Sequence, residues 1–161
     1  MTKIARLLLT ALASCAVLAA CDSDSGSTGG DGGTCSGATT GGAMVFESAG
    51  DGAAPAPAGG TIADGTYHLV EHRIHPPGGV DPNWRQRTLT VADGRFEGAE
   101  RDHAGLDIAY RGTFSTAGTT LTRTFECPVT TTITEQYTAT EGQLWIFSRE
   151  SPHEVYVYVR E

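Results

Sequence analysis

Basic residues are scarce in this chain of 161 residues, which carries 11 Lys and Arg against 19 Asp and Glu. Lys3 is its one lysine, the basic residues form no cluster, and the formal net charge is −8. Nucleic-acid binding and electrostatic adhesion to anionic lipid headgroups both depend on basic patches. The composition therefore predicts no nucleic-acid partner.

Long apolar runs are also missing. The longest stretch rich in apolar residues, Leu7–Ala20, has 14 residues, whereas a retained transmembrane helix needs about 17–25. This stretch follows Lys3 and Arg6 and ends in small residues, which is the layout of a secretory signal peptide. We therefore expect residues 1–20 to be a signal peptide that is removed.

Motifs for catalysis or metal binding are absent as well. The sequence has no nucleophile elbow, no His-Glu-x-x-His run and no Gly-rich phosphate loop. His68 and His72 are expected to share the solvent-facing side of one strand, about 13 Å apart, too far for one metal ion. The sequence thus predicts no catalytic residue, no metal and no cofactor, and a protein that is not an enzyme.

The end of the signal region has a recognisable pattern. Leu18-Ala19-Ala20-Cys21 resembles the lipobox of bacterial lipoproteins. The resemblance implies cleavage before Cys21, lipid on its thiol and its new amine, and a cell-envelope protein tethered to a membrane and facing the periplasm or the exterior. Ordinary secretion after Ala20 is the alternative, but Leu18 would then stand where a small residue is preferred. Asp22 hints at the inner membrane without deciding between the two membranes.

Residues 21–63 are rich in Gly, Ser, Ala and Pro, a composition typical of a flexible tether. Two cysteines remain after processing, Cys35 and Cys127, and an oxidising compartment favours a disulfide between them. Two free thiols or a metal site are the alternatives. The bridge would partly order the tether after Cys35.

From residue 64 onward the pattern has a period of two, typical of β-strands. Arg87, Leu89 and Val91 form one row, and turn signals such as Asp93-Gly94 separate successive runs. The expected strands are Gly65–His75, Arg85–Ala92, Arg95–Arg101, Leu106–Ser115, Thr119–Cys127, Val129–Ala139, Gln143–Ser148 and Val155–Arg160. They predict an all-β, antiparallel up-and-down meander over 64–161, closed as a barrel. A β-sandwich is the alternative.

The domain at 64–161 resembles a small lipocalin, or calycin-type barrel. Gly65-Thr66-Tyr67 stands where lipocalins have Gly-x-Trp, and Arg160 ends the last strand. The resemblance implies closure of the barrel by a cation–π contact between Tyr67 and Arg160. The candidate interior residues are Tyr67, Leu89, Leu106, Ile108, Tyr110, Phe114, Leu121, Phe125, Ile133 and Tyr137.

Two functions stay open at this point. Eight-stranded barrels either fill their interior with side chains or hold one small ligand. The first hypothesis is an envelope lipoprotein whose barrel binds a small apolar ligand. The second is a non-enzymatic structural or protein-interaction lipoprotein with a filled core, acting on a protein partner.

Overall fold

The computed structural model describes residues 35, 37–75, 80–148 and 154–161. The predicted signal peptide, the lipidation site Cys21 and most of the Gly-rich part of the tether lie outside the described residues. Within the described part, nine strands form one sheet: β1 (Val45–Ala49), β2 (Gly65–Ile74), β3 (Trp84–Ala92), β4 (Arg95–Asp102), β5 (Asp107–Ala117), β6 (Thr120–Cys127), β7 (Thr131–Ala139), β8 (Gln143–Phe147) and β9 (Glu154–Arg160).

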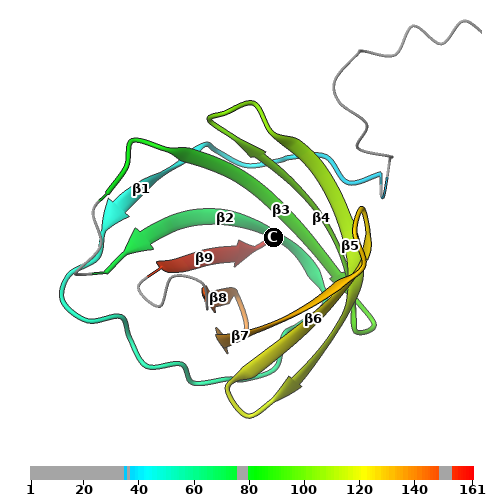
Figure 1. Cartoon of the computed structure of the whole chain (residues 1–161). Helices are drawn as coiled ribbons and strands as arrows, with labels where there is room; N and C mark the ends of the chain where they lie inside the picture. The colour runs from blue at the N-terminus through cyan, green and yellow to red at the C-terminus, as the bar shows by residue number, and fades with distance from the viewer. Residues whose placement is uncertain (1–34, 36, 76–79, 149–153) are drawn as a thin grey trace, which may run out of the picture.

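Strands β2 to β9 form a meander in which each strand pairs antiparallel with the next. The last strand returns to the first: β9 pairs antiparallel with β2, from Tyr67 opposite Arg160 to Ile74 opposite Glu154. The curved sheet thereby closes on itself (Figure 1). The predicted eight-strand meander is confirmed, and each predicted strand agrees with the observed one to within two residues at both ends.

Strand β1 was not predicted and lies in the segment expected to be a tether. Strands β2 and β3 pair only where Gly65–His68 faces Thr88–Val91, and they diverge beyond that point. β1 pairs with both of the diverging ends, parallel to β2 at Glu47 and antiparallel to β3 at Phe46. The segment after Cys35 therefore completes the sheet where two neighbours separate.

A disulfide joins Cys35 to Cys127 at the end of β6, with an S–S distance of 2.01 Å, which confirms the predicted bridge. The connector from β1 to β2 is also tied to the barrel. Gly59 donates its N–H to the Tyr137 carbonyl at 2.9 Å and accepts from the Ala139 N–H at 2.7 Å. Gly59 has a φ of 69°, and an added Cβ there would meet the Gly118 carbonyl, so the close approach requires glycine.

The apolar core occupies the half of the barrel that the C-terminal part of this connector reaches with Ile62. Its buried members include Tyr67, Leu69, Leu89, Val91, Phe96, Tyr110, Leu121, Tyr137, Leu144, Ile146, Tyr156 and Tyr158. Ile62 of the connector packs against them, as do the predicted interior residues Ile108, Phe114 and Phe125. Ile133 is half-buried and lies outside this cluster.

Leu106 was predicted to lie in the barrel interior, and this prediction is wrong: the side chain is 45% exposed. β5 begins one residue later, at Asp107. Leu106 belongs to the preceding turn, where its N–H donates to Oδ1 of Asp102 at 2.9 Å. That local hydrogen bond holds the residue in a turn rather than a strand, so the alternation of faces does not apply to it.

The prediction that His68 and His72 share a solvent-facing side is also wrong. β2 contains a bulge between Leu69 and Glu71, which shifts the alternation by one residue. Tyr67 and Leu69 are buried before the bulge, and His72 and Ile74 after it. The ring of His72 is completely buried, whereas His68 contacts Thr88 and Glu161.

The expected cation–π contact between Tyr67 and Arg160 does not occur. The Arg160 guanidinium donates to the Asp64 carbonyl at 3.2 Å and its stem passes over Gly65. The Tyr67 hydroxyl donates to the Ala63 carbonyl at 2.6 Å. The two residues are opposite each other in the ladder, so the barrel is closed by backbone pairing instead.

Candidate functional site

The inward-facing rows change from apolar to charged along the strands. On β3 the row runs Val91, Leu89, Arg87, Arg85, and on β9 it runs Tyr158, Tyr156, Glu154. Because successive inward residues follow the strand axis, both rows carry charge into the same half of the barrel, opposite the apolar core.

This charged half contains a cavity of about 520 Å³. It is lined by Arg85, Arg87, Arg123, Thr132, Ile133, Thr134, Glu135, Ser148, Glu154 and Tyr156. In the apolar half, by contrast, the space among Leu89, Phe96 and Leu121 amounts to about 10 Å³, room for one water at most. The two halves therefore differ: one is filled, and the other has the volume of a small-molecule site.

Arg85, Arg87 and Glu100 form a triad on one wall of the cavity. Both guanidiniums donate to the same carboxylate oxygen, Oε1 of Glu100, at 2.8 Å. The side chains of Arg87 and Glu100 are only 15% and 11% exposed. Glu100 is held there by β4, where it lies directly opposite Arg87 in the ladder. Two positive charges thus face one negative charge, and Arg85 is the most exposed of the three side chains, at 30%.

Arg87 is held from a second side by an aromatic ring. Its guanidinium carbon lies 4.2 Å from the centroid of the Tyr156 ring, a cation–π distance. Burial alone would lower the pKa of Arg87, but the phenol of Tyr158 and the Glu100 carboxylate raise it well above its ordinary value. The guanidinium is therefore both charged and fixed in orientation.

A second ion pair crosses from β6 to β7. Arg123 donates to Oε2 of Glu135 through Nε at 3.0 Å and also through Nη2. Both side chains are largely buried. Arg123 also lies over the Phe125 ring, 5.3 Å from its centroid. The pair links the charged half to the aromatic packing beneath it.

Glu154 lies next to Tyr156 in the inward row of β9 and receives two donors. Nε2 of His72 donates to its Oε1 at 2.6 Å, and the Tyr156 hydroxyl donates to the same oxygen. The rings of His72 and Tyr156 stack at 4.5 Å. Burial raises the pKa of Glu154, but the hydrogen bonds from His72 and Tyr156 together with the charges of His72 and Arg85 lower it, and the pKa lies below its ordinary value. Burial also raises the pKa of Tyr156, whose phenol stays neutral and donates.

The hydrogen bonding of this network is incomplete. Nε of Arg85, Nε of Arg87 and Nδ1 of His72 are buried and have no hydrogen-bond partner. Glu47 stands 3.8 Å from that Nδ1, beyond hydrogen-bond distance. Because an unsatisfied buried polar atom costs about 1–3 kcal/mol, the barrel keeps this charged half at the expense of stability.

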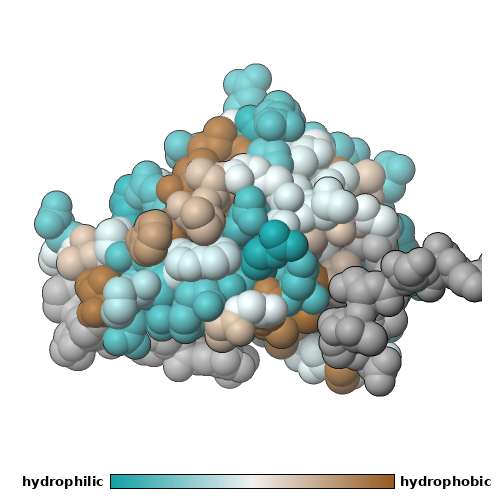
Figure 2. Space-filling view, turned by 90° about the horizontal axis from the view of Figure 1, so that it is seen from above, coloured by the Kyte–Doolittle hydropathy of each residue, from teal (hydrophilic) through white to brown (hydrophobic). Residues whose placement is uncertain are grey.

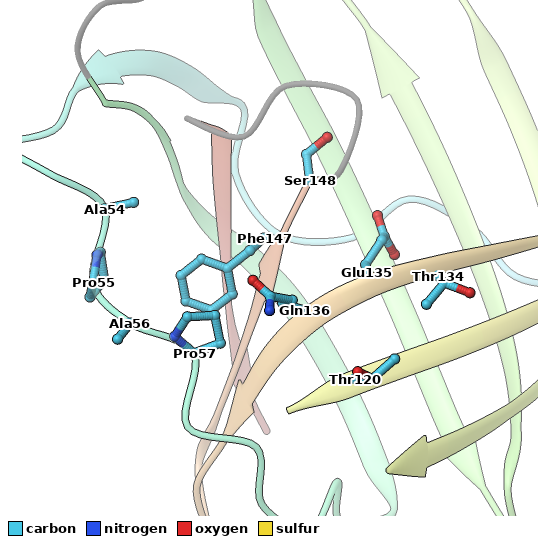
Figure 3. Close-up of a pocket in the computed structure, with 10 residues that line it drawn as sticks. All are labelled: Ala54, Pro55, Ala56, Pro57, Thr120, Thr134, Glu135, Gln136, Phe147 and Ser148. Atoms are coloured by element: carbon cyan, nitrogen blue, oxygen red, sulfur yellow. The ribbon is translucent and has the colours of Figure 1, made fainter. Parts of the chain in front are cut away.

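A groove of about 580 Å³ lies on the other side of β7. Figure 3 shows Ala54–Pro57 of the connector facing Phe147 and Gln136 across it. Thr134, Glu135 and Ser148 line both this groove and the charged cavity. Among the described residues that line the groove, Glu135 is the one that carries a charge, whereas five of those that line the cavity do.

The outer surface has fewer features of a binding site than the charged cavity. Figure 2 shows a face on which hydrophilic and intermediate residues predominate and hydrophobic patches are limited. Exposed Met44, Phe46 and Val70 line a shallower hollow of about 400 Å³ between β1 and β2.

In the described residues no helix could cross a membrane. Nor does this part of the chain group three His, Cys, Asp or Glu side chains as metal ligands would be.

No protein family matches this chain, and no curated protein matches it. A solved structure resembles it. This is the crystal structure of an uncharacterized protein from Bacteroides eggerthii, at 14% sequence identity and a TM-score of 0.46, and the match covers 61% of this chain and 98% of that one.

Apart from Leu106 and the two histidines of β2, the sequence pattern predicted the inward rows correctly, but the charged site was missed. None of Arg85, Arg87, Arg123, Glu100, Glu135 and Glu154 was predicted as a site residue. A signal was available, because Arg87 shares a row with Leu89 and Val91, and Arg123 shares one with Leu121 and Phe125. An arginine in an otherwise apolar row points inward with its neighbours and must find charge partners there.

Proposed function

We propose that the protein is a lipid-anchored cell-envelope lipoprotein whose barrel binds one small polar molecule in the charged cavity. The anchor rests on the lipobox-like sequence ending at Cys21. The binding role rests on one observation above all, the cavity of about 520 Å³, compared with the space of about 10 Å³ among Leu89, Phe96 and Leu121 in the apolar half.

The lining supports a polar ligand in place of the apolar one that the lipocalin resemblance implied. An apolar molecule in this cavity would bury the guanidiniums of Arg85 and Arg87 without offering them acceptors, at a cost of about 1–3 kcal/mol for each unpaired group. A ligand with hydrogen-bonding groups avoids that cost.

We propose binding without catalysis. Glu154, the carboxylate most favourably placed for acid–base chemistry, already accepts from His72 and Tyr156. Its pKa is lowered rather than raised toward neutral, whereas a general acid or base works best with a pKa near the operating pH.

A structural or protein-interaction role is the second candidate. One observation favours it: Met44, Phe46 and Val70 are exposed around the hollow between β1 and β2. Exposed apolar residues that line a hollow are typical of interaction surfaces. In that case the charged cavity would hold only water.

Native mass spectrometry of the purified protein tests the binding role. We expect a reproducible extra mass that is lost on denaturation. Ile133→Trp should abolish it, because Ile133 lines the cavity and a larger ring would fill it. The matched control is Val129→Trp, which places the same ring at a residue 67% exposed just before β7. A bare mass, or an extra mass that both variants keep, contradicts the proposed site.

A further inference from the structure

We propose that the group recognised in the cavity is an oxyanion, such as a carboxylate, sulfate or phosphate, held between the guanidiniums of Arg85 and Arg87. This inference rests on the proposed binding function and adds the chemical class of the ligand.

The local charge balance favours an anion at this wall. Arg85 and Arg87 share a single oxygen of one carboxylate, so the triad with Glu100 carries a net charge of +1. Among the described residues of the cavity, Glu135 is paired with Arg123, whereas Glu154 accepts hydrogen bonds from His72 and Tyr156 and keeps its negative charge. The three arginines and three carboxylates described in this half balance one another, but the positive charge is concentrated on the wall formed by Arg85 and Arg87, and Glu154 lies elsewhere on the lining.

The unused hydrogen-bond donors of Arg85 and Arg87 also favour an anionic ligand. A guanidinium has five N–H groups and no acceptor. Arg85 and Arg87 each make one hydrogen bond to Glu100, and their Nε atoms have no partner. A ligand that recruits these side chains must bring acceptor atoms, and oxyanions bring several in a plane or tetrahedron that matches the guanidinium fork.

The orientation of Arg87 is set in advance. Its guanidinium is held by Glu100 on one side and by the Tyr156 ring at 4.2 Å on another. A donor already ordered in the empty protein loses little entropy when a ligand binds. The same feature makes lysine a poor substitute, because an ammonium keeps the charge but lacks the planar fork.

Isothermal titration of the purified protein with citrate, and separately with inorganic phosphate, tests the inference. We expect saturable binding of at least one of them, weakened about tenfold or more by Arg87→Lys, which retains the charge. The matched control is Arg95→Lys. Arg95 makes an exposed ion pair with Glu126, so this variant should bind as the parent does.

Glu100→Gln provides a test of opposite sign. It removes a carboxylate that competes for both guanidiniums, and the affinity for the anion should rise about tenfold. An effect on folding alone would not strengthen binding, so this variant separates recognition from stability. It also replaces Arg87→Lys as the decisive variant if that protein does not fold.

Absence of binding by either anion up to ~10 mM would overturn the inference. So would binding that neither Arg87→Lys nor Glu100→Gln alters. Native mass spectrometry of the same preparation distinguishes a failure of the oxyanion inference from a failure of the proposed binding function. A neutral molecule lost from Ile133→Trp would leave the binding function standing and refute the oxyanion, whereas a bare mass together with no anion binding would refute both.

Discussion

Gly98 sets the position of the Tyr110 ring, and replacing it by alanine should destabilise the protein. A Cβ at residue 98 would lie 2.5 Å from Cζ and 2.7 Å from Oη of Tyr110. The ring has little freedom to move, because Tyr110 is buried and packs edge-to-face on Phe96 and Phe125, with centroid distances of 6.1 and 5.7 Å. Insertion of a methyl group into such packing costs about 1–3 kcal/mol.

Urea unfolding at a fixed protein concentration measures this change in free energy. Gly142→Ala is the matched control, because its added Cβ would meet no atom within 4 Å and its φ is not in the left-handed region. We expect that variant to stay within about 0.5 kcal/mol of the parent.

The cost of Gly98→Ala should disappear when the ring is removed. In a Tyr110→Leu background the same substitution should change the free energy of unfolding by less than about 0.5 kcal/mol, a coupling of the size found for residues in contact. The reasoning is refuted if Gly98→Ala matches Gly142→Ala, or if its cost is the same with and without the Tyr110 ring.

Three further predictions concern the lipid anchor, the disulfide bridge and the loss of stability at acid pH. Cys21→Ser should move the protein from the membrane to the soluble fraction of fractionated cells, and continued membrane association would contradict lipidation. Reduction of the Cys35–Cys127 bridge, which spans 92 residues, should lower the free energy of unfolding by about 2–5 kcal/mol; an unchanged urea midpoint with dithiothreitol would contradict this. Because the pKa of Glu154 is lower in the folded protein, its stabilising effect is present above its unfolded pKa and is lost as pH falls through the folded value. The free energy of unfolding of Glu154→Gln should therefore fall less steeply than that of the parent as the pH drops below about 4.5. An equally steep fall in both proteins would show that Glu154 does not contribute.

Local pattern was sufficient to predict the meander. Alternation with period two and turn signals such as Asp93-Gly94 depend on neighbouring residues, so both can be recognised in the sequence. The turn signals lie where the observed strands end. The pairing of Cys35 with Cys127 was predictable for a different reason, because two cysteines remain for a disulfide after the predicted cleavage and lipidation.

What could not be predicted depends on residues far apart in the sequence. β1 exists because β2 and β3 diverge and leave backbone groups to pair, which nothing within Val45–Ala49 indicates. The bulge after Leu69 has no glycine or other local marker, yet it turns His72 inward. Leu106 was misplaced because the turn at Asp102 extends further than the apolar pattern suggests.

The charged half was missed because charges were assumed to face solvent. That assumption holds for most surface residues, but it fails where a closed barrel brings inward rows from different strands together. Arg87 on β3 meets Tyr156 on β9, and Arg123 on β6 meets Glu135 on β7. Each inward arginine finds its partner on another strand, and only the register reveals the pair.

The most direct test of the central claim is the electron density in the cavity of the protein, crystallised as purified and without added ligand. The account predicts density for a molecule other than water beside Arg85 and Arg87, with acceptor atoms within hydrogen-bond distance of their guanidiniums. A cavity filled by rearranged side chains of the chain itself, or occupied by water alone, would contradict a binding role for this barrel.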